Sequence, residues 1–229
     1  MRIPAPAAAD LYNPSRVTRR FLLASLLALG APFRAAASAA PRSRRILRLK
    51  TGAVEEVDLG ARAHQTEAYT AINPFQRVPA LVLDDGTVLT ESIAICRYIE
   101  WLRPDPVLFG RSGIEAALIE MWERRVEHYL FGPVAQVFRH FHPAMKSLEA
   151  PQIPAWGEAN KARVLAALKL LDRELAAKPF VAGAAFSVAD ITALVAVDWM
   201  RPARLTVPDE LANLRRWHRE VSARPSATA

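Results

Sequence analysis

The spacing of hydrophobic positions separates a first half of the chain that mixes strands and helices from a second half that is helical. Alternation of Val54, Val57 and Leu59 with polar residues predicts a strand at about residues 53–59. The stretch "HQTEAYTAIN" then predicts a short helix, which ends at Asn73 because the residue before a proline is disfavoured in the helical region.

A hairpin and a second helix follow. The segments "ALVL" and "TVLT" flank Asp84-Asp85-Gly86, a sequence with strong turn chemistry, and together they predict a β-hairpin. A helix is predicted from Ser92 to about Leu102. The stretch "RPDPVLFG" then interrupts all periodicity and indicates a domain boundary.

The rest of the pattern is helical and contains no strand of comparable strength. Apolar residues at helical spacing predict four segments, at about residues 113–143, 155–177, 187–200 and 209–223. These elements predict a small βα domain followed by an all-helical domain.

One helix start is well marked by its sequence, "AAFSVADITALVA". Ser187 can cap the N–H of Asp190 while the Asp190 carboxylate reaches back to the cap, and Phe186 can pack on Ile191. These residue types predict a capping box with a structural role.

The segment "RRILRLKTGAVEEVDL" fits two structures before the strand at 53–59. It is either the tail of a helix that leads into the strand or a hairpin that turns at Thr51-Gly52. The local pattern leaves both open.

The formal charge of +7 lies almost wholly near the N-terminus. Residues 1–48 hold nine arginines and one aspartate, so the remaining 21 basic and 22 acidic groups leave a net charge of −1. A nucleic-acid partner needs clustered positive charge on the folded surface, so none is expected. The single cysteine, Cys96, excludes an intramolecular disulfide and any multi-cysteine metal site, and indicates a reducing compartment. Because it lies in an apolar helix face, a buried hydrophobic role is expected.

The N-terminal region resembles an export signal. Paired arginines precede an apolar run at 21–31, and small residues end at 37–39. The run is too short for a stable membrane anchor, which needs roughly 20 apolar residues. Two alternatives stay open: a strand, turn and helix of the fold with Ser15 near the helix start, or an upstream stretch that does not belong to the fold.

The sequence around the predicted hairpin favours a site for a small peptide-like anion. A helix start offers free N–H groups and a partial positive charge, so Ser92 is suited to hold a carboxylate, and Glu91 beside it is suited to an ammonium group. An α-amino acid head carries both charges. If the Val78–Pro79 bond is cis, the Val78 backbone can pair with an extended peptide.

These motifs carry a resemblance to a known family. "HQTEAYTAINPFQRVPALVLDDGTVLTESIAICRYIE" resembles the glutathione-binding half of the cytosolic glutathione transferase superfamily, and "FVAGAAFSVADITALVAVDW" resembles the capping-box helix of its helical half. The resemblance covers about residues 53–225. It implies a thioredoxin-like N-terminal domain followed by an all-helical C-terminal domain, the glutathione transferase fold.

The resemblance also implies how glutathione is held. Glu91 and Ser92 would hold the γ-glutamyl head, and Val78 would pair with the cysteinyl backbone beside cis-Pro79. His64 and Arg77 match positions that contact the glycine end of glutathione in theta-like members. The alternative for His64 is a surface helix residue, and the alternative for Arg77 is a solvated cation.

The N-terminus departs from the family, whose members begin with a strand and a helix that meet at the Ser, Tyr or Cys that stabilises the glutathione thiolate. That first strand is internal in the family's sheet. In one register "LYNPSRVTRRFLL" supplies strand and helix, with Tyr12 or Ser15 near the thiol. In the other, "APRSRRILRLKTG" is the tail of the helix, with Ser38 or Ser43 near the thiol. No catalytic residue is assigned.

The resulting expectations are specific. Residues 1–45 form an atypical N-terminal segment, 46–103 a thioredoxin-like glutathione-binding domain and 111–229 an all-helical domain. The expected function is conjugation of glutathione to a small apolar electrophile by a cytoplasmic, homodimeric enzyme of detoxification. The alternatives are a binding module that docks glutathione without activating its thiol, and export through the signal-like residues 15–39.

Two further groups of side chains bear on the prediction of sites. The histidines at 128, 140 and 142 have no carboxylate or thiol at ligand spacing, so no metal site is predicted. By resemblance, Trp122, Arg125 and Tyr129 border the pocket for the electrophile.

Overall fold

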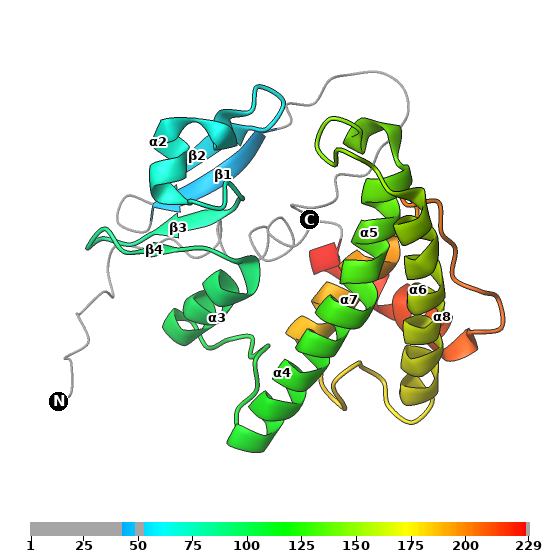
Figure 1. The fold of residues 1–229 in the computed structure, drawn as a ribbon. Helices are drawn as coiled ribbons and strands as arrows, with labels where there is room; N and C mark the ends of the chain where they lie inside the picture. The colour runs from blue at the N-terminus through cyan, green and yellow to red at the C-terminus, as the bar shows by residue number, and fades with distance from the viewer. Residues whose placement is uncertain (1–42, 49–52, 228–229) are drawn as a thin grey trace. The chain divides into compact units, whose positions relative to one another are not determined.

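The computed structural model describes residues 43–48 and 53–227 of the chain, which divide after Leu102 into two compact units. The first unit holds a small sheet with helices, and the second is helical (Figure 1). The predicted fold class is confirmed. In the described ranges, no helix is both long and apolar enough to cross a membrane.

The sheet of the first unit has four strands in the order β2-β1-β3-β4. The strands are β1 Ser43–Arg48, β2 Ala53–Asp58, β3 Ala80–Val82 and β4 Val88–Leu89. β1 is therefore internal, antiparallel to β2 and parallel to β3.

The β1–β2 pair settles the ambiguous segment. Ser43 pairs with Asp58 and Arg48 with Ala53, so the two strands form a hairpin joined through residues 49–52. Parallel strands would need a crossover of a dozen or more residues, and four residues permit only the antiparallel arrangement. The helix-tail interpretation of "RRILRLK" is wrong, and so is the register built on it. The expected domain start at residue 46 falls inside β1.

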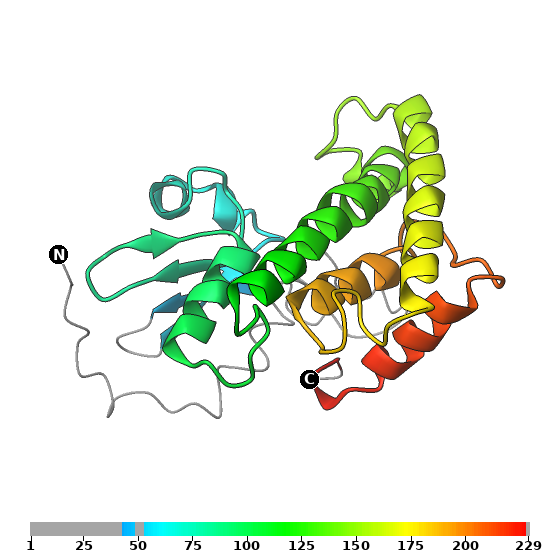
Figure 2. The same cartoon turned by 90° about the horizontal axis from the view of Figure 1, so that it is seen from below.

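Helices cover both faces of this sheet. The helical elements are η2 Ala63–Gln65, α2 Glu67–Ile72 and α3 Ser92–Leu102. Successive residues of a strand face opposite sides, so Leu81 packs with α3 residues while Val82 packs toward Tyr69 of α2. Figure 2 shows α2 and α3 on opposite sides of the strands.

The second unit is built from five main helices and three short helical pieces within residues 103–227. The main helices are α4 Gly113–Val126, α5 Gly132–Phe141, α6 Pro154–Leu175, α7 Val188–Asp198 and α8 Ala212–Ser222. The short pieces are η3 Glu127–Phe131, η4 Pro143–Met145 and η5 Pro225–Ala227. The segment before α4 belongs to this unit, because Leu108 and Phe109 are buried and the Leu108 carbonyl accepts the Val188 N–H at 3.1 Å.

The element η3 is a π-helical turn that joins α4 to α5 in one rod (Figure 2). Pro133 has no N–H to continue the regular ladder, and the Gly132 N–H bonds instead to the carbonyl of Glu127, five residues earlier. The pattern at 113–143 predicted one helix, and the π turn is the local difference.

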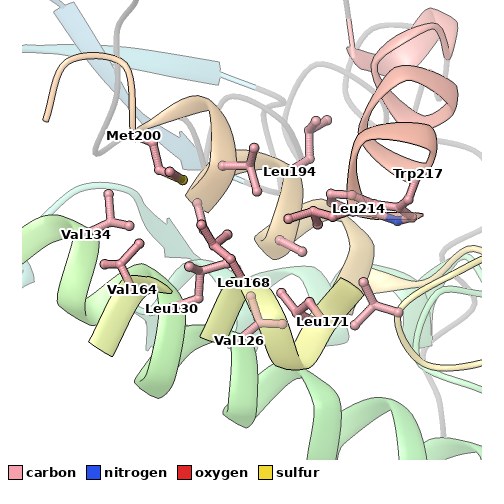
Figure 3. Close-up of a cluster of buried hydrophobic side chains, with 14 of the residues drawn as sticks. Val126, Leu130, Val134, Val164, Leu168, Leu171, Leu194, Met200, Leu214 and Trp217 are labelled. Carbon is pink, nitrogen blue, oxygen red and sulfur yellow. The ribbon is translucent and has the colours of Figure 1, made fainter. Parts of the chain in front are cut away.

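α7 is the centre of the helical unit. Its residues from Val188 to Val197 are all buried, and side chains from α4, α5, α6 and α8 surround it (Figure 3). At its start the carboxylate of Asp190 accepts the N–H of Ser187 at 3.0 Å and the Ser187 hydroxyl at 3.2 Å. The predicted capping box is confirmed. The contact of Phe186 with Ile191 stays a prediction.

Candidate functional site

The start of α3 has an unusual backbone conformation. Glu91 has a φ of +63°, a left-handed value that is uncommon for a residue with a side chain and that occurs often at functional sites. Its carbonyl accepts the Ile95 N–H at 3.0 Å, so Glu91 lies at the cap position, and its side chain is exposed. No acidic side chain lies in the first turn of α3, so the partial positive charge of this helix start is not neutralised from within the turn.

The loop before β3 carries the backbone that the site hypothesis requires. The Val78–Pro79 bond is cis. Neither the N–H nor the C=O of Val78 is hydrogen-bonded to any residue within the described ranges. This backbone can therefore pair with an added extended peptide without breaking a bond of the fold.

Two side chains of α2 and its end hold this loop. The Tyr69 hydroxyl donates to the Arg77 carbonyl at 2.6 Å, and the Asn73 side-chain amide donates to the same oxygen at 2.7 Å. Burial raises the pKa of Tyr69 to about 12, so its hydroxyl stays protonated and remains a donor at any physiological pH. Asn73 also accepts the Phe75 N–H at 3.0 Å. The residue before Val78 is therefore fixed by two donors.

The hairpin register brings the loop and the helix start to the same end of the sheet. Leu81 pairs with Leu89 and Val82 with Val88. β3 begins one residue after Pro79, and β4 ends two residues before Glu91. The start of one strand and the end of its antiparallel partner lie at the same end of a sheet. Both halves of the predicted site therefore adjoin the same end of this hairpin.

A cationic group forms a third part of this unit's surface. Burial lowers the pKa of His64, and the positive charges of Arg77 and Arg62 lower it further, so these three side chains share one electrostatic environment. The Nδ1 atom of His64 is buried and has no hydrogen-bond partner among the residues whose structure is described. Such an orphaned atom beside two arginines suits an anionic ligand group.

Three residues of this arrangement were missed from the sequence. Tyr69 and Asn73 act through a carbonyl several residues away, and nothing in the local pattern marks that bond. Arg62 has a φ of +57°, which its residue type does not indicate. The proline after Asn73 predicted where the helix ends, but not that the Asn73 side chain binds the Arg77 carbonyl.

The thiol-activating residue is not located. Tyr12, Ser15 and Ser38 lie outside the described residues, and Ser43 is the first residue of β1. The four-residue connection from β1 to β2 has no room for a helix, so the strand–helix junction expected from the family does not occur between these strands.

The candidate residues of the helical unit differ in their exposure and contacts. Trp122 is buried, with the Arg125 guanidinium 4.8 Å and the Lys178 ammonium 4.2 Å from its ring, so its ring is covered by cations. Tyr129 is exposed. His140 accepts the Ile153 N–H at 3.0 Å. Across the described part of the chain, no three metal-ligating side chains lie close enough together to hold an ion.

Comparison with known proteins assigns the family. Residues 42–102 match the family model of the glutathione S-transferase N-terminal domain, and residues 154–220 match that of the C-terminal domain. The chain is 34% identical over 171 residues to "Glutathione S-transferase 2" of Saccharomyces cerevisiae, which covers 74% of this chain and 73% of the relative.

More distant relatives and a solved structure extend the comparison. The crystal structure of a glutathione S-transferase domain-containing protein from Marinobacter aquaeolei VT8 is 30% identical, covers 94% of this chain and 98% of its own, and superposes with a TM-score of 0.73. "Probable elongation factor 1-gamma 1" of Arabidopsis thaliana is 32% identical over 56% of this chain and 30% of its own length. On the strength of the yeast relative and the two domain models, this chain belongs to the glutathione S-transferase family.

Proposed function

We propose that this chain is a glutathione transferase that joins the sulfur of glutathione to a small apolar electrophile. The observation that supports the proposal is the Val78 backbone, which follows a fixed loop, precedes a cis-proline and has no hydrogen-bond partner within the described ranges. The antiparallel β3–β4 hairpin leads from this loop to the Glu91–Ser92 helix start. The Val78 backbone can pair with the main chain of a peptide, and the Glu91–Ser92 helix start can hold the charged head of the same peptide.

Each part of glutathione has a matching group in the first unit. The γ-glutamyl head has both charges on one carbon, so its carboxylate suits the start of α3 and its ammonium suits Glu91. The cysteinyl N–H and C=O suit the Val78 backbone. The terminal glycine carboxylate suits His64 and Arg77, with Arg62 adding positive charge.

The reaction follows from thiol chemistry. The thiolate is the nucleophile, so the thiol proton leaves to solvent, a carbon–sulfur bond forms at the electrophile, and any leaving group departs with its electron pair. Glutathione is consumed as a co-substrate, and no metal ion takes part in this scheme.

The proposed protein is a homodimer of the cytoplasm with a role in detoxification. Each unit carries exposed apolar side chains that water disfavours: Trp101 and Leu102 on α3, and Ile114 and Leu118 on α4. A single buried cysteine suits a reducing compartment. Export through residues 15–39 is the competing proposal, and N-terminal sequencing of the natively produced protein distinguishes the two.

The first test removes the head-group site. The double variant Glu91→Ala with Ser92→Ala is expected to lose retention on immobilised glutathione, because both the ammonium partner and the hydroxyl at the helix start are gone. The matched control is Asp84→Ala with Thr87→Ala, which removes an acid and a hydroxyl at the turn end of the same hairpin. Retention of the Glu91/Ser92 variant at the wild-type level would remove the site assignment.

The second test loosens the Val78 loop without touching the ligand groups. Asn73→Ala removes one of the two donors to the Arg77 carbonyl, at a cost of about 1–2 kcal/mol. Glutathione affinity is therefore expected to fall about 5- to 30-fold, as measured by calorimetric titration. Adding Tyr69→Phe should weaken binding further. A folded double variant with unchanged affinity would show that the hydrogen bonds to the Arg77 carbonyl do not position the site.

A glutathione-binding module without transferase activity is the second candidate. The β1–β2 hairpin favours it, because no strand–helix junction lies between these strands to carry a thiol-activating side chain. The similarity to an elongation factor subunit also fits a role in binding. Thiolate absorbance of bound glutathione separates the two, since an enzyme lowers the pKa of the bound thiol and a binding module leaves it at the free value.

A further inference from the structure

Glu123 is a carboxylic acid in the apolar core of the helical unit. It lies on α4, one turn before the π turn η3, and its side chain is 0% exposed. The Thr192 hydroxyl of α7 donates to its Oε1 at 2.9 Å. Its Oε2 is buried with no hydrogen-bond partner among the residues that the structure describes. Half of the carboxyl group is therefore unsatisfied.

Arg124 is the positively charged residue near Glu123, and it also pairs with two other glutamates. The Arg124 Nη2 atom is 3.7 Å from Glu123 Oε1, longer than a hydrogen bond. Arg124 meanwhile pairs with Glu120 at 3.2 Å through Nε and with Glu127 through Nη1. Glu120 and Glu127 add negative charge near Glu123, which offsets part of the effect of the Arg124 charge.

The facing helix supplies no compensating charge. α7 presents Thr192 to Glu123, and its two carboxylates are bound elsewhere: Asp190 accepts from Val181, Ser187 and Trp217, and Asp198 pairs with His218. An ionised Glu123 is thus a buried charge with one hydrogen bond and a distant, shared counter-ion, which is costly.

A protonated Glu123 fits the same place well. Its hydroxyl can donate to the Thr192 oxygen, or one carboxyl oxygen can keep accepting from Thr192, and no charge needs solvation. Burial raises the pKa of Glu123 from 4.5 to about 7, while the Thr192 hydrogen bond and the Arg124 charge lower it in part. The neutral form is therefore the one that the packed domain prefers.

We propose that Glu123 is a proton-linked switch of the helical unit: it is neutral when α4 and η3 are fully packed on α7, and its ionisation near neutral pH loosens that packing. The π turn that follows is where the ladder is already irregular, so it is the place at which α4 opens to let water reach the carboxylate. This device acts within the helical unit and does not depend on the glutathione site.

The sign of the pH dependence follows from the two pKa values. Because the folded pKa of about 7 exceeds the unfolded value of 4.5, the folded state binds this proton more tightly. The contribution of Glu123 to stability is complete below the lower value, falls as pH rises between the two, and is lost above the higher one. The shift corresponds to about a 300-fold rise in the unfolding equilibrium constant across that interval.

The test compares denaturant unfolding of the full chain and of Glu123→Gln at a series of pH values. Burial also raises the pKa of Asp190, which gives a slope of the same sign in both proteins, so the difference between them reports Glu123. That difference is expected to be about 300-fold. The matched control is Glu120→Gln, which removes a half-exposed carboxylate from the same arginine. It should keep the fall in stability with pH, moved slightly to lower pH, because the Glu120 charge is the smallest of the causes that act on the pKa of Glu123.

Direct titration keeps the proposal falsifiable if Glu123→Gln does not fold. Carbon-13 NMR of the glutamate side chains should show one carboxyl group that titrates near neutrality and disappears in Glu123→Gln. Thr192→Val removes the donor to the ionised form and should move this titration to higher pH. Hydrogen exchange in η3, corrected for intrinsic rates, should quicken above the midpoint. A Glu123 that titrates like a free glutamate, or equal pH slopes for wild type and Glu123→Gln, would overturn the switch.

Discussion

Replacement of Asp190 by alanine is expected to lower the free energy of unfolding of the helical unit by about 3–5 kcal/mol. The buried Asp190 carboxylate accepts hydrogen bonds from Val181 at 2.8 Å, from the Trp217 indole at 2.8 Å and from the Ser187 N–H at 3.0 Å. Alanine leaves these buried donors without partners, and each orphaned donor costs about 1–3 kcal/mol.

Denaturant unfolding followed by tryptophan fluorescence measures this loss, since four of the five tryptophans lie beyond residue 102. Asp198→Ala on the same helix is the matched control. Its side chain is 53% exposed and pairs with His218, so a change below about 1 kcal/mol is expected. Ser187→Ala should fall between the two, at about 1 kcal/mol. If Asp190→Ala lowered the free energy of unfolding as little as Asp198→Ala does, the hydrogen bonds to the Asp190 carboxylate would not be what stabilises this unit.

The capping box shows what local sequence can predict. Ser187 and Asp190 are three residues apart, and the pairing of their side chains and backbone depends only on that spacing. The bonds to Val181 and Trp217 join residues 9 and 27 positions from Asp190. Those bonds depend on how α8 packs on α7, which no local pattern states.

The β1 strand shows where the sequence was undecided. Four of its six residues are polar or charged, and the short apolar pair fits a strand or a helix end equally well. Pairing with β3, more than thirty residues later in the chain, places the strand inside the sheet. A non-local contact therefore decides the structure, and with it the absence of a helix between β1 and β2.

The candidate site also combines residues that the local sequence suggests with residues that only the folded structure identifies. Val78, Pro79, Glu91 and Ser92 could be proposed from the sequence because they flank a hairpin whose turn and strands have a clear local pattern. The support from Tyr69 and Asn73 could not, because it runs through the Arg77 carbonyl, a backbone atom that every residue has. The thiol-activating group could not be assigned from the sequence, because the segment before β2 fitted two registers.

Gly110→Ala is expected to destabilise the helical unit by about 2–5 kcal/mol, the sum of two costs. Gly110 has a φ of +93°, where a side chain costs about 1–2 kcal/mol. An added Cβ would also lie 2.7 Å from the Ala116 nitrogen and 2.9 Å from the Ala116 Cα. These are backbone atoms in the first turn of α4, so no flexible side chain can move aside, and overpacking adds about 1–3 kcal/mol.

The matched control for Gly110 lies three residues further along the same connection. Gly113 begins α4, a Cβ there meets nothing within 4 Å, and its φ lies outside the left-handed region. Gly113→Ala should therefore stabilise the unit by about 0.4–1 kcal/mol, because alanine reduces the freedom of the unfolded chain. The same chemical change thus has opposite signs at two nearby glycines, and thermal unfolding measures both. If both variants melted alike, the close approach of residue 110 to α4 would not be what fixes this connection.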